Sequence, residues 1–154
     1  MSETARIVDL LERTYDGEAW HGPSLSAILQ GVTATVAARK PEEGGHSIWE
    51  LVAHIAQWEG VTLRRLQGEP VEFDLDTEGD WPPVTDASEA AWQQMMARLD
   101  KNHRDLREGI VSAGDAKLLE KAPNREFTHY VALHGIIHHR VYHAGQIALL
   151  KKQR

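Results

Sequence analysis

The sequence contains no cysteine, which removes several kinds of chemistry at once. No disulfide can form, no thiolate can hold a metal ion, and no cysteine nucleophile is available. Any metal site must therefore use histidine and carboxylate side chains. An excess of positive charge is also missing, because 17 lysines and arginines stand against 23 aspartates and glutamates, for a net charge of −6. Nucleic acid is therefore not expected as a partner, since binding to phosphates needs a cationic surface.

Long apolar runs and several common motifs are missing as well. The first 17 residues lack the basic start and apolar stretch of a signal peptide, and no segment is apolar over the length needed to cross a bilayer. We therefore expect a cytoplasmic protein with no membrane partner. The sequence has no glycine-rich phosphate loop, no nucleophile elbow and no His-Glu-x-x-His motif, so three common classes of enzyme site are not predicted.

Apolar residues recur mainly at the three- and four-residue spacing of amphipathic helices. A short helical segment is expected within residues 24–38, and 71–73 is the only plausible extended segment. The 154 residues suit one domain, 1–154. We expect an all-α four-helix bundle with a short extra helical segment and long loops. The four long helices are expected at about 3–15, 48–67, from 86 or 88 to 110, and 128–152.

An acidic stretch lies between the second and third of these helices. Asp74, Asp76 and Glu78 resemble the first half of a calcium-binding EF-hand loop. The position at which that loop needs a bidentate glutamate is Thr85, however, and no pair of helices is phased around the stretch. The six acidic residues within 69–80 are therefore expected to form a solvated loop.

The last predicted helix is apolar on two faces rather than one. A helix of this kind is buried on several sides, so it is either central in the bundle or carries an oligomer interface on its second face. A homodimer is therefore expected. Gly135 and Gly145 are costly inside a helix and indicate close packing or the approach of a ligand.

Four histidines lie between residues 134 and 143 of this helix: His134, His138, His139 and His143. Residues four apart stand one turn apart on the same helix face, so each of the pairs 134/138 and 139/143 can place two imidazoles around one point. Imidazole is a good ligand for zinc, nickel, copper and iron. Spacing alone does not choose between the two pairs, although Gln146 makes the face of the second pair more polar.

A catalytic metal site usually needs a third protein ligand, and His54 is the best candidate. It lies in the middle of the second long helix, at the edge of the apolar stripe, and would face the second pair if these two helices run side by side. The simpler interpretation is that these histidines are partly buried polar residues, each satisfied by a hydrogen bond. Three further side chains are candidates for orienting a ligand or relaying a proton: Glu50, Gln146 and His21.

Two stretches of the chain, IWELVAHIAQWE at residues 48–59 and HHRVYHAGQIALLKK at 138–152, resemble the DinB/YfiT-like family of metalloenzymes. The segments WHGPSL and RLQGEP are also similar to that family, so the resemblance covers nearly the whole chain. It implies a four-helix bundle, often dimeric, with a divalent metal held by one histidine from the second long helix and two from the last. Carried onto this sequence, the implied ligands are His54, His139 and His143.

The family pattern often has an aspartate after the first histidine of the final pair, and this chain has Arg140 there. The helical spacing directs Arg140 away from the pair, so we expect it to alter only the charge near the bundle surface. Characterised relatives include transferases and isomerases that use low-molecular-weight thiols, and hydrolases have also been proposed. The resemblance therefore implies a small-molecule substrate.

Together, the residues and the resemblance predict a metal-dependent transferase or hydrolase. A three-histidine site holding Zn²⁺ or Ni²⁺ would activate a thiol cosubstrate for S-transfer or a water for hydrolysis. The alternative is a non-catalytic, dimeric helix bundle that binds a metal or a small ligand. The substrate does not follow from the fold or from the ligand set.

Overall fold

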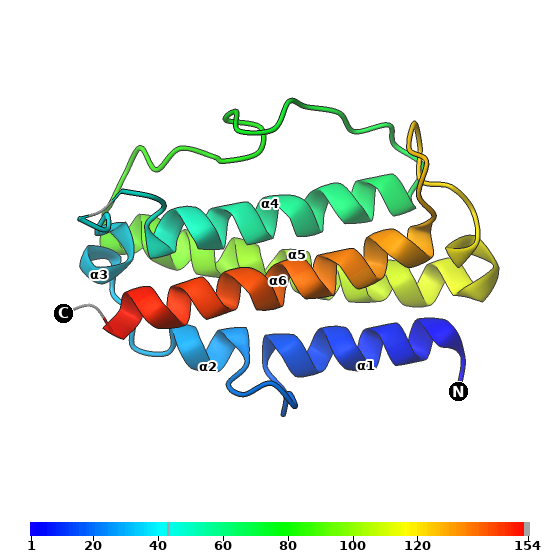
Figure 1. Ribbon diagram of the computed structural model, residues 1–154, viewed down its shortest axis with the longest axis horizontal. Coiled ribbons are helices and arrows are strands. Elements are labelled where there is room, and N and C mark those ends of the chain that lie inside the picture. Colours follow the sequence, from blue (N-terminus) through cyan, green and yellow to red (C-terminus); the bar gives the residue numbers. More distant parts are fainter. Residues whose placement is uncertain (43, 153–154) are drawn as a thin grey trace.

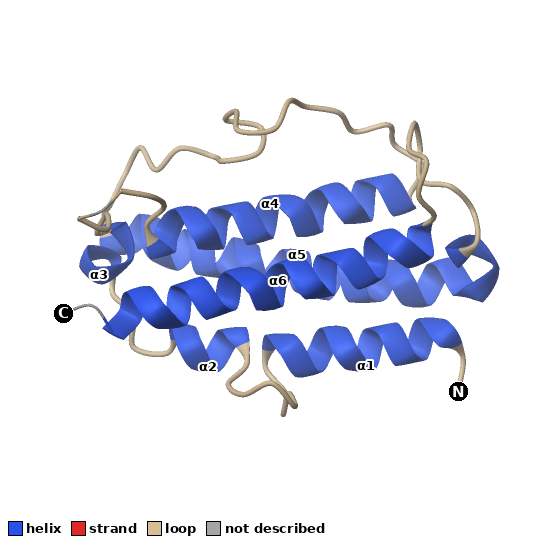
Figure 2. Cartoon of the chain, in the orientation of Figure 1, coloured by secondary structure: helices blue, strands red, loops and turns tan. Residues whose placement is uncertain are grey.

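The computed structural model describes residues 1–42 and 44–152. These residues form six α-helices and no β-strand, which confirms the prediction of an all-α fold (Figure 2). Residues 71–73, predicted as extended, belong to an irregular loop. None of the helices within the described ranges combines the length and the hydropathy that crossing a membrane requires.

The four long helices are α1 (Glu3–Tyr15), α4 (Ile48–Leu66), α5 (Glu89–Leu118) and α6 (His129–Lys152). They lie alongside one another, and α6 contacts both α4 and α1 (Figure 1). Two short helices, α2 (Leu25–Leu29) and α3 (Ala34–Ala38), complete the bundle at one end. The segment 67–88, green in Figure 1, runs back over the length of α4 and covers one side of it.

Serine caps fix where three of the long helices begin. The hydroxyls of Ser2, Ser47 and Ser88 each accept a hydrogen bond from a backbone N–H in the first turn of the helix that follows. At α4 the arrangement is the reciprocal capping box that the sequence predicts, because the carboxylate of Glu50 also accepts from the Ser47 backbone N–H at 2.8 Å. These bonds satisfy donors that the first turn of a helix leaves free, and they set the position of His54 along α4.

Helix α5 is longer than predicted. It was expected to end near Ile110 but reaches Leu118, with an interruption at Gly114, where φ is +70° and ψ is 169°. This conformation suits glycine, since other side chains rarely adopt positive φ. Beyond Ile110, the carboxylate of Asp115 accepts hydrogen bonds from the backbone N–H groups of Glu3 and Thr4 at the start of α1.

A polar layer crosses the bundle between two apolar clusters. Arg140 of α6, Glu59 of α4 and His103 of α5 meet in this layer, and Arg140 also donates to the backbone carbonyl of Leu11 in α1 at 2.7 Å. Arg140 and Glu59 are both 0% exposed. The expectation that Arg140 affects the bundle surface is therefore wrong. The helical spacing correctly predicts that the side chain of Arg140 points away from His139 and His143. In that direction, however, it is covered by the other three long helices and does not reach the surface.

Candidate metal centre

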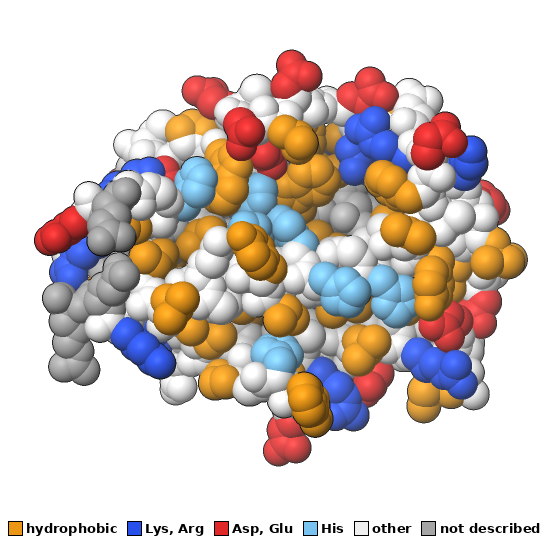
Figure 3. Space-filling model, in the orientation of Figure 1, with side chains coloured by type: hydrophobic (Ala, Val, Ile, Leu, Met, Phe, Trp, Pro, Cys, Tyr) orange, Lys and Arg blue, Asp and Glu red, His pale blue; other side chains and the backbone are white. Residues whose placement is uncertain are grey.

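Three histidines from two helices meet in one cluster. His54 stands in the middle of α4, and His139 and His143 stand one turn apart on the adjacent face of α6. One ring nitrogen from each lies within 4.8 Å of the others, and the Nε2 atoms of His54 and His139 are 2.9 Å apart. In Figure 3, histidine side chains gather on the face formed by α4, α6 and the loop above them.

Hydrogen bonds at Nδ1 fix the protonation pattern of two of the three rings. Nδ1 of His54 lies 2.8 Å from the backbone carbonyl oxygen of Asp80, and Nδ1 of His143 lies 2.7 Å from Oε1 of Gln146. Both oxygens can only accept, so each Nδ1 carries the proton and each Nε2 keeps its lone pair. This is the tautomer that a histidine needs to bind a metal through Nε2.

The third ring, His139, has a polar atom without a partner. Its Nδ1 is buried and forms no hydrogen bond with any described residue. Burial is also the main cause that lowers the pKa of all three histidines, that of His139 to about 3. The rings are therefore neutral at pH 7, and Nε2 of His139 donates to the unprotonated Nε2 of His54. A divalent metal ion would take the place of this shared proton, so a cluster of neutral imidazoles fits such an ion.

Comparison with known families supports the same interpretation. A model of the DinB superfamily matches residues 19–147, which include the whole of α4 and all three histidines. This chain belongs to the DinB superfamily. Searches of curated proteins and of solved structures gave no significant match. Membership and the histidine cluster together fit a metal-binding DinB-like protein.

Aromatic rings form one wall of the cluster in this DinB-superfamily protein. Trp81 stacks on His54 at a centroid distance of 3.8 Å and on His46 at 3.5 Å, so the indole lies between the two imidazoles. Trp58 contacts both His54 and His139 with tilted rings. These contacts restrict the rotation of His54 and keep water away from one side of it, in line with its lowered pKa.

The loop that carries Trp81 is more than a solvated connection, which corrects the expectation for the acidic stretch. Asp80 is only 5% exposed. Its carboxylate accepts hydrogen bonds from Nε1 of Trp58 at 2.8 Å and from the Asp76 backbone N–H at 3.0 Å, while its carbonyl holds His54. The other acidic residues of the stretch are exposed. Asp80 therefore fastens the loop to α4 and orients a candidate ligand.

The remaining predicted site residues have different positions. Glu50 is occupied by the helix cap and by an ion pair with Lys40 at 2.6 Å. His21 is exposed in the loop between α1 and α2, which Figure 1 shows across the bundle from the 67–88 loop. His134 lies 4.0 Å from the carboxylate of Glu3, and His138 is exposed. The fold thus brings the 139/143 pair, and not the 134/138 pair, to His54.

Two cavities flank the cluster. One, of about 230 Å³, is mostly apolar and is bordered by His139, Trp58 and Arg65. The other, of about 680 Å³, is bordered by His46 and by Gln146, the partner of His143. A molecule in either cavity therefore lies against a member of the cluster or against a residue that touches one.

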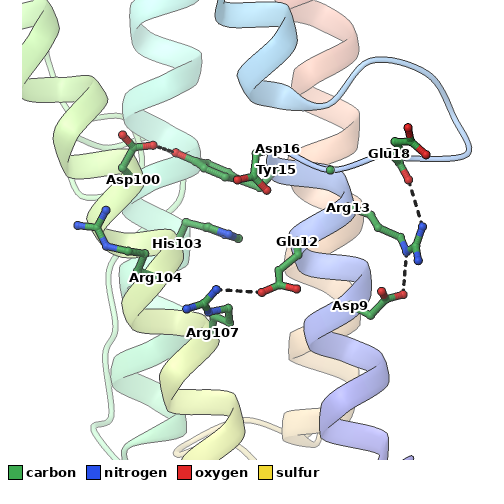
Figure 4. Close-up of a pocket in the computed structure, with 11 residues that line it drawn as sticks. Asp9, Glu12, Arg13, Tyr15, Asp16, Glu18, Asp100, His103, Arg104 and Arg107 are labelled. Carbon is green, nitrogen blue, oxygen red and sulfur yellow. Dashed lines mark hydrogen bonds and ion pairs between the residues drawn. The ribbon is translucent and has the colours of Figure 1, made fainter.

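A further cavity, of about 550 Å³, opens between α1 and α5 (Figure 4). Four of its charged side chains pair with one another: Arg107 with Glu12 at 2.9 Å, and Arg13 with Asp9 at 2.8 Å. His103 belongs to its wall and stacks on Tyr15. With its ion pairs closed, this cavity offers less chemistry than the histidine cluster.

Proposed function

We propose that this protein is a metal-dependent enzyme in which His54, His139 and His143 hold Zn²⁺ or Ni²⁺. The observation that carries the proposal is the fixed protonation of two rings, with Asp80 and Gln146 accepting at Nδ1 and leaving Nε2 unprotonated. Three imidazole ligands leave a coordination position for water or substrate, as in catalytic zinc sites. When bound, the cation would supply a lowered pKa for a coordinated water or thiol.

The chain's own residues orient the site and exclude water from it. Asp80 and Gln146 hold two of the rings by hydrogen bonds, and Trp81 and Trp58 cover the faces and edges of His54. Arg140 is turned toward Glu59 on the other side of α6, so its charge is already paired. The cluster itself therefore stays neutral, which favours a bound cation.

The pair of cavities favours thiol transfer over hydrolysis. In S-transfer, a low-molecular-weight thiol loses its proton and its sulfur forms a bond to an electrophilic carbon of a second organic molecule, while the bond from that carbon to its leaving group breaks and the leaving group takes up a proton. Two organic molecules must therefore be held near the cluster. Hydrolysis needs room for only one organic molecule besides water. The cavities beside His139 and beside Gln146 supply two such spaces.

Metal analysis of protein purified without a histidine tag tests the first step. We expect about one equivalent of Zn or Ni, loss of this metal in His139→Ala, and retention in the matched control His138→Ala, which changes an exposed neighbour on the same helix. Absence of stoichiometric metal from the parent protein, or equal metal content in the two variants, would contradict the proposal.

Activity assays before and after chelation test the second step. Thiol transfer to electrophiles and hydrolysis of esters and amides are measured on the same metal-loaded preparation, and we expect thiol transfer that chelation abolishes and added metal restores. Metal binding without any chelator-sensitive activity in these assays would instead support a non-catalytic metal- or ligand-binding bundle.

We also propose that the protein is a homodimer that pairs through the outward face of α6. Val131, Tyr142 and Leu149 are 54%, 66% and 65% exposed on this helix. Their spacing of 11 and 7 residues places all three on one side of α6, where a second chain would cover them. Light scattering is expected to give twice the mass of one chain for the parent protein. For Tyr142→Glu it is expected to give the mass of a single chain.

A further inference from the structure

We propose that the cavity beside His139 binds a small organic substrate with an apolar body and a carboxylate, and that Arg65 holds the carboxylate. The inference rests on the proposed function, because it names the class of molecule that would react at the histidine cluster. It is carried by the walls of the cavity, by the unpaired charge of Arg65 and by a glycine that keeps the cavity open.

The walls of the cavity are apolar over most of their area. Its volume of about 230 Å³ suits a molecule the size of a single ring with a short side chain. Binding in an apolar lining is favourable for an apolar group, because both surfaces are removed from water. A fully hydrated polar group gains no such free energy of binding. The apolar residues of the lining are Trp58, Phe127, Ala132, Leu133 and Ile136.

Arg65 is the cation of this cavity, and no carboxylate of the described residues lies within ion-pair distance of it. The residue is 8% exposed, and its Nε and Nη2 atoms donate to the carbonyl of Val71 at 3.2 and 2.8 Å. Among the described residues it forms no ion pair, since the neighbouring Glu72 is paired with Arg125 at 3.7 Å instead. Nη1 donates no hydrogen bond to the described chain. A buried guanidinium without a carboxylate is costly unless a ligand supplies one.

The same cavity reaches the histidine cluster. His139 is part of its lining, and the ring of Trp58, which also lines it, lies 6.0 Å from the ring of His139 between centroids. The guanidinium carbon of Arg65 lies 5.7 Å from the centroid of the Trp58 ring. A molecule that spans the cavity therefore contacts Arg65 with one end and a candidate metal ligand with the other.

Gly135 keeps the wall of the cavity open. It stands inside α6, lines the cavity, and a Cβ atom added there would meet no atom within 4 Å. Close packing, one of the two explanations that the sequence suggested, is therefore excluded for this residue. Gly145 lies on the same helix with equally open surroundings, but it borders none of the cavities described above. The two glycines thus form a matched pair for testing the cavity.

The test measures binding of phenylacetate and its neutral amide, phenylacetamide, to metal-free protein at pH 8 by calorimetry. Chelation removes any metal to which the carboxylate might bind. We expect phenylacetate to bind about tenfold or more tightly than the amide, because hydrogen bonds to a charged group are the stronger ones. Arg65→Met should remove this preference. Gly135→Leu should weaken both ligands about tenfold or more, and Gly145→Leu should change neither by more than about twofold.

Equal affinity for acid and amide, no measurable binding of either, or unchanged binding to Gly135→Leu would overturn the inference. Because Arg65 also holds the Val71 carbonyl, Arg65→Met is first checked for cooperative unfolding. If that variant fails to fold, Gly135→Leu still tests the cavity, and the difference between acid and amide in the parent protein still tests for a cation there. Metal content measured before chelation keeps the two proposals apart. If the protein prefers phenylacetate to the amide but contains no metal, only the proposal of a metal-dependent enzyme is contradicted. If it contains metal but shows no such preference, only the proposal of a carboxylate site is contradicted.

Discussion

Arg140 donates two hydrogen bonds to one oxygen of Glu59, at 2.5 and 2.9 Å, in the centre of the bundle where neither residue is exposed. The pair joins α6 to α4, and further bonds from the same guanidinium reach α1 and α5. One residue thus links all four long helices. The other carboxylate oxygen of Glu59 is buried without a partner in the described chain.

Removing one member of this pair should be far more harmful than removing both. Arg140→Met leaves a buried carboxylate without its cation, and we expect it to lower the free energy of unfolding by about 3–5 kcal/mol. The double variant Arg140→Met, Glu59→Leu should recover most of that loss. Urea denaturation measures all three proteins. Arg13→Met serves as the control. It breaks an ion pair with Asp9 in which both side chains are 52% exposed, and it should leave the free energy of unfolding nearly unchanged. A double variant as unstable as the single one would contradict this account.

Gln146 should control metal affinity without being a ligand. Its Oε1 fixes the proton of His143 on Nδ1, and Gln146→Leu removes that acceptor while keeping the size of the side chain. We expect a loss of about 10–100-fold in affinity for Zn²⁺, the usual effect of removing a hydrogen bond to a liganding histidine. Competition with a chromophoric chelator measures it. Gln93→Leu, on exposed α5 surface, is the control, and equal affinities for the two variants would rule out this role.

Asp80 should link the ordering of the 67–88 loop to the metal affinity of the histidine cluster. Asp80→Ala keeps the carbonyl that holds His54 but removes the carboxylate that accepts from Trp58 and from the Asp76 backbone. We expect faster proteolysis within residues 67–88 and weaker metal binding, because the loop loses its anchor to α4. Asp74→Ala changes an exposed acid of the same loop and should do neither. If proteolysis changes but affinity does not, the loop and the site are independent.

Acid should destabilise the fold through His103. Burial, aided by Arg140, Arg107 and Arg104, lowers the pKa of His103 from 6.5 to about 3. Between these values the unfolded chain binds the proton and the folded chain does not. The stabilisation is therefore complete above about pH 6.5 and is lost as the pH falls toward 3, by up to about 1.4 kcal/mol per pH unit from this residue.

Metal-free His103→Gln should show a shallower fall in unfolding free energy than the parent protein when urea denaturation is repeated from pH 7 to pH 4. His138→Gln, at an exposed position of α6, should keep the parent's slope. Identical slopes in the two variants would mean that another group is responsible for the acid sensitivity.

The helices were predictable because their evidence is local. Apolar spacing and serine caps located α1, α4 and α6 closely, whereas Gly114 interrupts α5 and hid its true end at Leu118. Spacing gave two possible histidine pairs, and mainly the resemblance to the DinB-like family favoured the pair that the fold brings to His54.

The surroundings of the site were not predictable in the same way. His54 is held by the backbone carbonyl of Asp80, and a backbone contact leaves no pattern in the sequence. The only available signal was Trp81 and the two prolines after it, unusual residues for a purely solvated loop. Arg140 was misplaced for a related reason, because helical spacing gives the direction of a side chain but not which other helices cover that direction.

Trp81 is positioned as a fluorescent probe of the histidine cluster. Its indole is held between His46, which is 43% exposed at its side chain, and His54, which is 6% exposed. Fluorescence from a stacked indole depends on the charge of the rings in contact with it. The outer ring therefore reports on the solvent and the inner ring on the occupant of the cluster, so the protein carries its own optical probe at the boundary between the two.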